Sequence, residues 1–206
     1  MSLKKIAVLI SGGGSNLQAV IDKVHKKDGI IDIVISDEED AYGLTRAQKA
    51  DIETLVINSK SYDSREDFAG AIEEELTKRN IDLIVLAGFM KILPPSFAKT
   101  FKNRIINVHP SLIPSFCGKG YYGIKVHEAV LNYGTKITGA TVHFADEGAD
   151  TGPIIIQGTV PVLNDDTPEI LQKRVLEVEH MILPKAVSLF CLDKLEIKGR
   201  IVYIKE

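Results

Sequence analysis

The segment KIAVLISGGGSNLQA, residues 5–19, decides the fold. It begins with an apolar run rich in branched side chains, which is typical of a parallel strand buried on both faces. Three glycines at 12–14 end this run. Apolar residues then recur at three- and four-residue intervals from Leu17 to Val24, which predicts a helix over 16–27 with one buried face. A buried strand, a tight turn and an amphipathic helix are typical of the opening of a doubly wound α/β domain.

The same alternation continues outward along the chain. Further strands are predicted at 31–36, 54–57, 82–88, 104–110, 137–145 and 153–162, and further helices at 44–50, 64–79, 96–101, 124–132 and 168–190. Asp63 or Ser64 can cap the third helix, and a hairpin or strand around 195–204 ends the chain. We therefore predict one α/β domain over 1–206, with a mostly parallel, doubly wound sheet and helices on both faces.

Composition excludes several classes of protein. The formal net charge of -3 gives no bulk positive field for nucleic acid, and no apolar run approaches the roughly 18 residues of a membrane span. Cys117 and Cys191 match no zinc or CxxC spacing, and the N-terminus shows no cleavable signal. We expect a cytoplasmic protein without metal, and with no nucleic-acid or membrane partner.

The turn from Ser11 to Asn16 is the first candidate site. It joins a strand to the N-terminus of a helix, where free amides and the helix dipole favour an anion such as phosphate. Neither GxGxxG nor GxxxxGK[ST] fits, because Leu17 stands where both need glycine. The alternative is a tight turn that only lets the helix pack on the strand.

A second constellation follows the strand at 104–110. Alternation places Asn107 and His109 on one side of it, at the edge where parallel sheets bind ligands. Asp150, in an acidic glycine-containing loop, can present a carboxylate to an imidazole. The alternatives are a capped turn enforced by Pro110 and an acidic surface turn. His25, His127 and His180 fit solvated or supporting positions better than catalysis.

Taken together and in order, these segments resemble the phosphoribosylglycinamide formyltransferase family, folate-dependent enzymes of purine synthesis. The resemblance covers essentially the whole chain. Its carriers are VLISGGGSNLQA at 8–19, AGFMKIL at 87–93, INVHPSLIP at 106–114 and TVHFADEGADTGPIIIQ at 141–157. It implies a Rossmann-like formyltransferase fold, with a phosphate- and ribonucleotide-binding half at 1–100 and a folate and catalytic half at 101–206.

The resemblance also implies the roles of individual residues. The catalytic residues would be Asn107, His109 and Asp150; the substrate-binding residues Gly13, Gly14, Ser15, Asn16 and Glu179; and the folate-binding residues Arg65, Met90, Lys91, Ile92, Leu93 and Asn107. Two positions depart from the pattern. Lys91 stands where relatives often have arginine, so we expect it to act through its backbone and stem, and Leu176 replaces a glutamine that helps to hold the phosphate in some relatives.

The implied reaction transfers the formyl group of the co-substrate 10-formyltetrahydrofolate to the amine of 5'-phosphoribosylglycinamide. The neutral amine would attack directly, Asn107 and protonated His109 would stabilise the oxyanion, and Asp150 would assist proton transfer. The partners would be these small molecules, and the protein a monomer or homodimer. The alternatives are a formyltetrahydrofolate deformylase-like hydrolase and a nucleotide-binding oxidoreductase or sensor.

Overall fold

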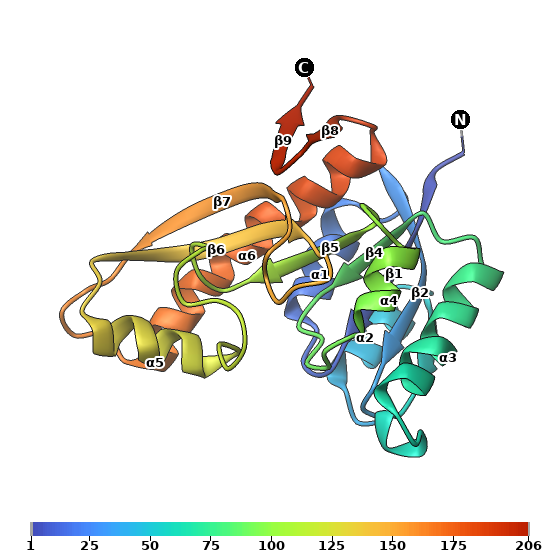
Figure 1. Ribbon diagram of the computed structural model, residues 1–206, viewed down its shortest axis with the longest axis horizontal. Helices are drawn as coiled ribbons and strands as arrows, with labels where there is room; N and C mark the ends of the chain where they lie inside the picture. Colours follow the sequence, from blue (N-terminus) through green and yellow to red (C-terminus); the bar gives the residue numbers. More distant parts are fainter. Residues whose placement is uncertain (1, 206) are drawn as a thin grey trace.

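The computed structural model describes residues 2–205 and places the first strand, β1, in the interior of a nine-stranded sheet (Figure 1). The elements follow the order β1 (Lys4–Ile10), α1 (Ser15–Lys23), β2 (Gly29–Ser36), α2 (Tyr42–Lys49), β3 (Glu53–Val56), η1 (Ser59–Ser61), α3 (Arg65–Lys78), β4 (Leu83–Leu86), α4 (Pro95–Thr100), β5 (Ile105–His109), α5 (Ile124–Tyr133), β6 (Ile137–Phe144), β7 (Ile154–Pro161), α6 (Pro168–Cys191), β8 (Leu195–Lys198) and β9 (Ile201–Ile204). Every predicted element is present.

The strands lie in the order β3-β2-β1-β4-β5-β6-β7-β9-β8. From β3 to β5 all neighbours are parallel, which confirms the doubly wound part of the prediction. The strands β6 and β7 then continue the sheet antiparallel to their predecessors. The last two strands form a hairpin, and β9 pairs with β7 in parallel.

Two apolar clusters cover the two faces of the sheet. Residues of β1 alternate between them: Ile6, Val8 and Ile10 pack with α1, α2, α5 and α6, whereas Ala7 and Leu9 pack with α3 and α4. All five side chains are fully buried. Burial on both faces is the reason why the strand reads as a continuous apolar run, and it confirms that helices cover both faces (Figure 1).

One helix boundary lies where the sequence predicts it and another does not. Ser64 caps α3 as predicted, since its Oγ accepts a hydrogen bond from the Asp67 amide at 3.0 Å. Helix α1 stops at Lys23, four residues earlier than predicted. Lys26 adopts a left-handed conformation with φ of 59°, and the His25 Nδ1 atom accepts the Ile31 amide at 2.9 Å, which turns the chain directly into β2.

The strand order reverses at β1, which has β2 on one side and β4 on the other. Crossovers from such a strand diverge, so a crevice opens beyond the carboxyl ends of β1 and β4. The turn after β1 and the segment after β4 therefore face the same space. No helix within residues 2–205 is long and apolar enough to cross a membrane.

Candidate active site

The turn between β1 and α1 presents free backbone amides. Gly14 is the helix N-cap with φ of 69°, and a Cβ there would lie 2.6 Å from the Gly43 Cα, whereas Gly12 and Gly13 face open space. Within the described residues, the first amide of this helix with a backbone acceptor belongs to Gln18, at 2.9 Å from the Gly14 carbonyl. The preceding amides are therefore available to an anion.

Asn16 and Glu179 meet beside this turn, although 163 positions separate them in the sequence. The Asn16 Nδ2 atom donates to the Glu179 Oε2 atom at 2.6 Å, and both side chains are buried. Burial raises the pKa of Glu179 to about 7, against the opposing effect of the Asn16 hydrogen bond. The Asn16 Oδ1 atom is buried without a partner in residues 2–205, so it can accept a hydrogen bond from a ligand.

Asn107, His109 and Asp150 come together at the carboxyl end of β5. The His109 Nδ1 atom lies 3.5 Å from the Asp150 Oδ2 atom, and the His109 Nε2 atom lies 2.9 Å from the Phe116 carbonyl oxygen. Because a carbonyl can only accept, Nε2 carries a proton. The Asp150 backbone has φ of 58°, and its Oδ2 atom accepts the Gly118 amide at 2.9 Å. The loop after β6 thereby fixes the carboxylate beside the imidazole.

Burial and charge act against each other on this pair. Burial lowers the pKa of His109, while the Asp150 carboxylate and the Phe116 carbonyl oppose that effect. For Asp150, burial raises the pKa, but the neighbouring His143 ring, the charge of His109 and the hydrogen bond from the Gly118 amide bring it below the ordinary carboxyl value. The carboxylate is therefore ionised at neutral pH. In the ligand-free protein, burial disfavours the protonated His109 that the proposed reaction uses.

His143, for which the sequence favours a structural role, lies between two members of the trio. It pairs with Asn107 across β5 and β6, and the Asn107 Nδ2 atom lies 3.2 Å from the His143 Nε2 atom. Its Nε2 atom also lies 3.6 Å from the Asp150 Oδ1 atom, and its Nδ1 atom faces the Phe144 carbonyl at 2.9 Å. The buried His143 ring therefore holds both the amide and the carboxylate in place.

Thr141 fixes the turn that follows His109. It lies opposite His109 in the antiparallel pair, and its hydroxyl donates to the Ser111 carbonyl at 2.6 Å. The same oxygen accepts the Ile113 amide at 3.1 Å and the Gln157 Nε2 atom at 3.0 Å. Three hydrogen bonds at one buried oxygen leave the turn little freedom.

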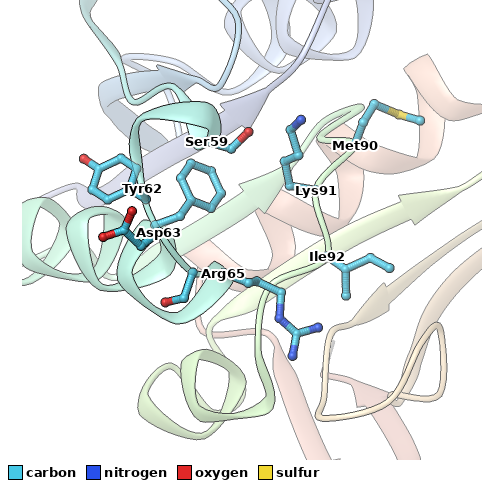
Figure 2. A pocket seen from close by; sticks show the side chains of 9 residues that line it. Ser59, Tyr62, Asp63, Arg65, Met90, Lys91 and Ile92 are labelled. Carbon is cyan, nitrogen blue, oxygen red and sulfur yellow. The ribbon is translucent and has the colours of Figure 1, made fainter.

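A pocket of about 540 Å³ opens next to the segment after β4 (Figure 2). It is lined by Ser59, Tyr62, Asp63, Ser64, Arg65, Phe68, Met90, Lys91 and Ile92. Met90 and Ile92 are both exposed on this segment and offer apolar surface to a ligand. Leu93 is not among the lining residues, because it packs on the core beneath α3 and α4.

The Lys91 ammonium lies beside a buried carboxylate. Its Nζ atom lies 3.4 Å from the Asp37 Oδ2 atom and 3.9 Å from the Glu38 Oε1 atom. Asp37 is 1% exposed, and its carboxylate oxygens have no hydrogen-bond partner within residues 2–205. The ammonium therefore compensates a buried charge, in addition to any role of its backbone and stem.

Two hydrogen bonds join the anion-binding turn to the pocket segment. The Ser11 amide donates to the Gly88 carbonyl at 3.2 Å, and the Ser11 Oγ atom accepts the Met90 amide at 2.8 Å. The turn, the pocket segment and Asn107 and His109 of the trio come at or directly after the carboxyl ends of β1, β4 and β5, which are parallel neighbours and therefore end at the same edge of the sheet.

The other histidines divide into two kinds. His127 is buried, and burial together with the charge of His109 lowers its pKa to about 4, so of the two expected positions it has the supporting one and not the solvated one. His25 and His180 are partly buried. Within the described residues, no group of three or more His, Cys, Asp or Glu side chains could hold a metal ion.

The chain matches a family model described as formyl transferase over residues 4–187. It is 40% identical to phosphoribosylglycinamide formyltransferase of Haemophilus influenzae, over 98% of this chain and 94% of that protein. The solved structure of glycinamide ribonucleotide transformylase 1 from Symbiobacterium toebii superposes with a TM-score of 0.93 at 43% identity, covering 99% of this chain and 95% of the other.

A second kind of relative is much longer. The trifunctional purine biosynthetic protein adenosine-3 of Bos taurus is 44% identical over 98% of this chain, but the match covers only 20% of that protein. The chain therefore spans about a fifth of this relative's length.

Proposed function

The chain belongs to the formyl transferase family, within its phosphoribosylglycinamide formyltransferase group, and on that premise we propose that it transfers the formyl group of 10-formyltetrahydrofolate to the amine of 5'-phosphoribosylglycinamide in purine biosynthesis. The observation that carries this proposal is the position of the Asn107, His109 and Asp150 trio. His109 and Asp150 meet at the carboxyl end of β5, at the same edge of the sheet as the turn with free amides after β1 and the pocket segment after β4.

The ribonucleotide occupies the β1–α1 turn in this proposal. The free amides of Gly13, Gly14, Ser15 and Asn16 hold the phosphate, assisted by the positive end of the helix dipole. The ribose hydroxyls lie between the unpartnered Asn16 Oδ1 atom and Glu179. This arrangement directs the amine towards β5.

The folate occupies the pocket beside the segment at 88–93. Met90 and Ile92 offer apolar contact to the ring, and Arg65 offers a guanidinium to an acidic group of the folate. Lys91 supports the segment through its pairing with Asp37, and Leu93 supports it from the core side. We assign phosphate and ribonucleotide binding to the half at 1–100, and folate binding and catalysis to the half at 101–206. Two groups cross that division: Glu179 belongs to the second half but would contact the ribose, and the pocket residues belong to the first half but would contact the folate.

The chemistry begins when the neutral amine attacks the formyl carbon. A C–N bond forms, the carbonyl electron pair moves to oxygen, and the resulting oxyanion needs donors that are already in position. Asn107 supplies an amide N–H. His109 can donate from Nδ1 only as the imidazolium, because the neutral ring carries its proton on Nε2; at 3.5 Å from Asp150, Nδ1 is not held by a short hydrogen bond.

Asp150 makes the charged form of His109 accessible when it is needed. Burial disfavours the imidazolium in the free protein, but a developing oxyanion adds a second negative charge beside the ring. The proton released by the attacking nitrogen passes, with help from Asp150, to the folate nitrogen. That nitrogen leaves as the C–N bond breaks and the formyl carbonyl forms again.

The competing reaction is hydrolysis, in which water replaces the amine. The free amides of the β1–α1 turn and the buried Asn16–Glu179 pair favour transfer. Beside the folate pocket they offer a binding site for a phosphate and sugar hydroxyls, which a hydrolase that uses water does not need. We further propose small-molecule partners only, no resident metal, a monomer or homodimer, and a cytoplasmic location.

A spectrophotometric assay of a 10-formyl folate tests the proposal, with and without 5'-phosphoribosylglycinamide. We expect deformylation of the folate to depend on the amine. An equal rate in both samples would support the hydrolase instead. Thermal stabilisation by nicotinamide nucleotides and none by folates would support an oxidoreductase or sensor.

A further inference from the structure

Helix α2 contacts the β1–α1 turn through two hydrogen bonds to successive carbonyls. The Gly43 amide donates to the Gly12 carbonyl at 3.0 Å, and the Arg46 Nε atom donates to the Gly13 carbonyl at 2.8 Å. The fit is close, since a Cβ on Gly43 would lie 3.2 Å from the Gly14 Cα and 2.4 Å from a core methyl. Both carbonyls are therefore fixed towards α2.

The direction of the two carbonyls also determines the direction of the amides that follow them. In a planar trans peptide, the C=O of one residue and the N–H of the next point in opposite directions. Fixing the Gly12 and Gly13 carbonyls towards α2 therefore directs the Gly13 and Gly14 amides away from it. A substitution that frees the Gly13 carbonyl allows its peptide plane to rotate, and the Gly14 amide rotates with it.

The guanidinium of Arg46 also brings charge to this turn. Its Nη1 atom donates to the Gln18 Oε1 atom at 3.3 Å, and its Cζ atom lies 5.0 Å from the centre of the Tyr42 ring. No ion pair within residues 2–205 involves Arg46, so its positive charge is not neutralised by a carboxylate. On α6, burial lowers the pKa of His180, the neighbour of Glu179 in the sequence, and the charges of Lys23 and Arg46 lower it further.

We propose that Arg46 is a positioning residue for the ribonucleotide phosphate: it holds the Gly13 carbonyl so that the Gly14 amide faces the anion, and it leaves a positive charge beside it. The inference rests on the proposed function, in that it needs a phosphate at this turn. It assigns α2 the role of supporting the anion site, with Gly43 as the second contact.

The test compares Arg46→Met, Arg46→Lys and a matched control, Lys49→Met, which removes an exposed charge from the same helix. Steady-state kinetics give kcat and the KM of each substrate, and calorimetry gives the Kd of inorganic phosphate. For Arg46→Met we expect a rise of about tenfold in the ribonucleotide KM and the phosphate Kd, with kcat and the folate KM within about twofold. Arg46→Lys keeps the charge and is expected to recover part of the loss, and Lys49→Met to match the wild type.

Unchanged ribonucleotide KM and phosphate Kd in a folded Arg46→Met protein would overturn the inference. So would equal losses for both substrates, or an equal loss in Lys49→Met. If Arg46→Met does not fold, Arg46→Gln carries the same expectation. A wild type that binds phosphate but shows no formyl transfer would overturn the proposed function instead, and the phosphate Kd would still decide on Arg46.

Discussion

Replacing Asp150 by asparagine removes one negative charge and little else. Asparagine has nearly the same shape, tolerates the left-handed backbone that Asp150 adopts with φ of 58°, and can still accept the Gly118 amide through its oxygen. The variant is therefore expected to fold. Alanine would strain this backbone and lose the hydrogen bond as well, so it would not isolate the charge.

The distance in the structure sets the expected magnitude. Opposite charges 3.5 Å apart, the distance between His109 Nδ1 and Asp150 Oδ2, attract by about 5 kcal/mol at an effective dielectric constant of about 20. At about 1.4 kcal/mol per tenfold in rate, loss of this attraction lowers kcat by about three orders of magnitude. Since the imidazolium forms mainly as the oxyanion develops, the KM of both substrates should change little.

The assay is steady-state kinetics of formyl transfer for Asp150→Asn, with Asp146→Asn as the matched control. Asp146 lies in the same loop but is exposed, and it bonds only to Gly148 and Thr151 within the described residues. The control should retain turnover within about threefold, as a surface change does. Near-normal kcat in Asp150→Asn would refute the electrostatic role, and a large rise in KM without loss of kcat would move Asp150 from catalysis to binding.

Three further predictions concern the surrounding residues. Lys91→Met leaves Asp37 buried without its cation and should lower the free energy of unfolding by about 1–3 kcal/mol in denaturant titrations. The double variant Lys91→Met/Asp37→Asn should recover this stability, and an unchanged stability in Lys91→Met would show that the pair does not stabilise the fold. The raised pKa of Glu179, about 7, means that the folded protein keeps a proton that the unfolded chain releases near pH 4.5, so stability falls as the pH rises from about 4.5 to 7. Glu179→Gln should therefore be more stable than the wild type at pH 8, by at most about 3 kcal/mol. Equal Tm values at pH 5 and 8 for both proteins would contradict this. Gly13→Val should fold and weaken ribonucleotide binding selectively, whereas Gly14→Val should lower Tm because its Cβ meets backbone; the opposite order of stability would be evidence against the packing described.

Much of the fold could be predicted from local patterns. The apolar run of β1, the Ser64 cap of α3 and the spacing of α6 are each local signals, and each is confirmed. The end of α1 is accompanied instead by a side-chain contact, in which the His25 ring accepts the Ile31 amide of β2. A helical pattern in the sequence cannot show such a contact.

The candidate site was predictable to the extent that its residues share a motif. Asn107 and His109 alternate on one strand, and the resemblance supplies Asp150. The role of His143 depends on the antiparallel register of β5 and β6, which places it opposite Asn107 after a crossover of more than twenty residues. A register of this kind is set by tertiary packing.

Charges brought together by the sheet order were the hardest to foresee. Lys91 follows β4 and Asp37 follows β2. Their side chains meet because both strands flank β1 and end at the same edge of the sheet. The same holds for Arg46, whose partner carbonyl at Gly13 is 33 positions earlier in the chain. Sequence alone gives the residue types, whereas the topology gives the pairs.

The most direct test of the central claim follows the formyl carbon itself. The wild-type protein is mixed with 10-formyltetrahydrofolate labelled with carbon-13 in the formyl group, with 5'-phosphoribosylglycinamide present, and the products are resolved by NMR over a single turnover. We predict that the label appears in the amide of the ribonucleotide, with little free formate, and that the Asp150→Asn variant slows its appearance. Labelled formate released at the same rate with or without the amine would contradict transfer to the amine.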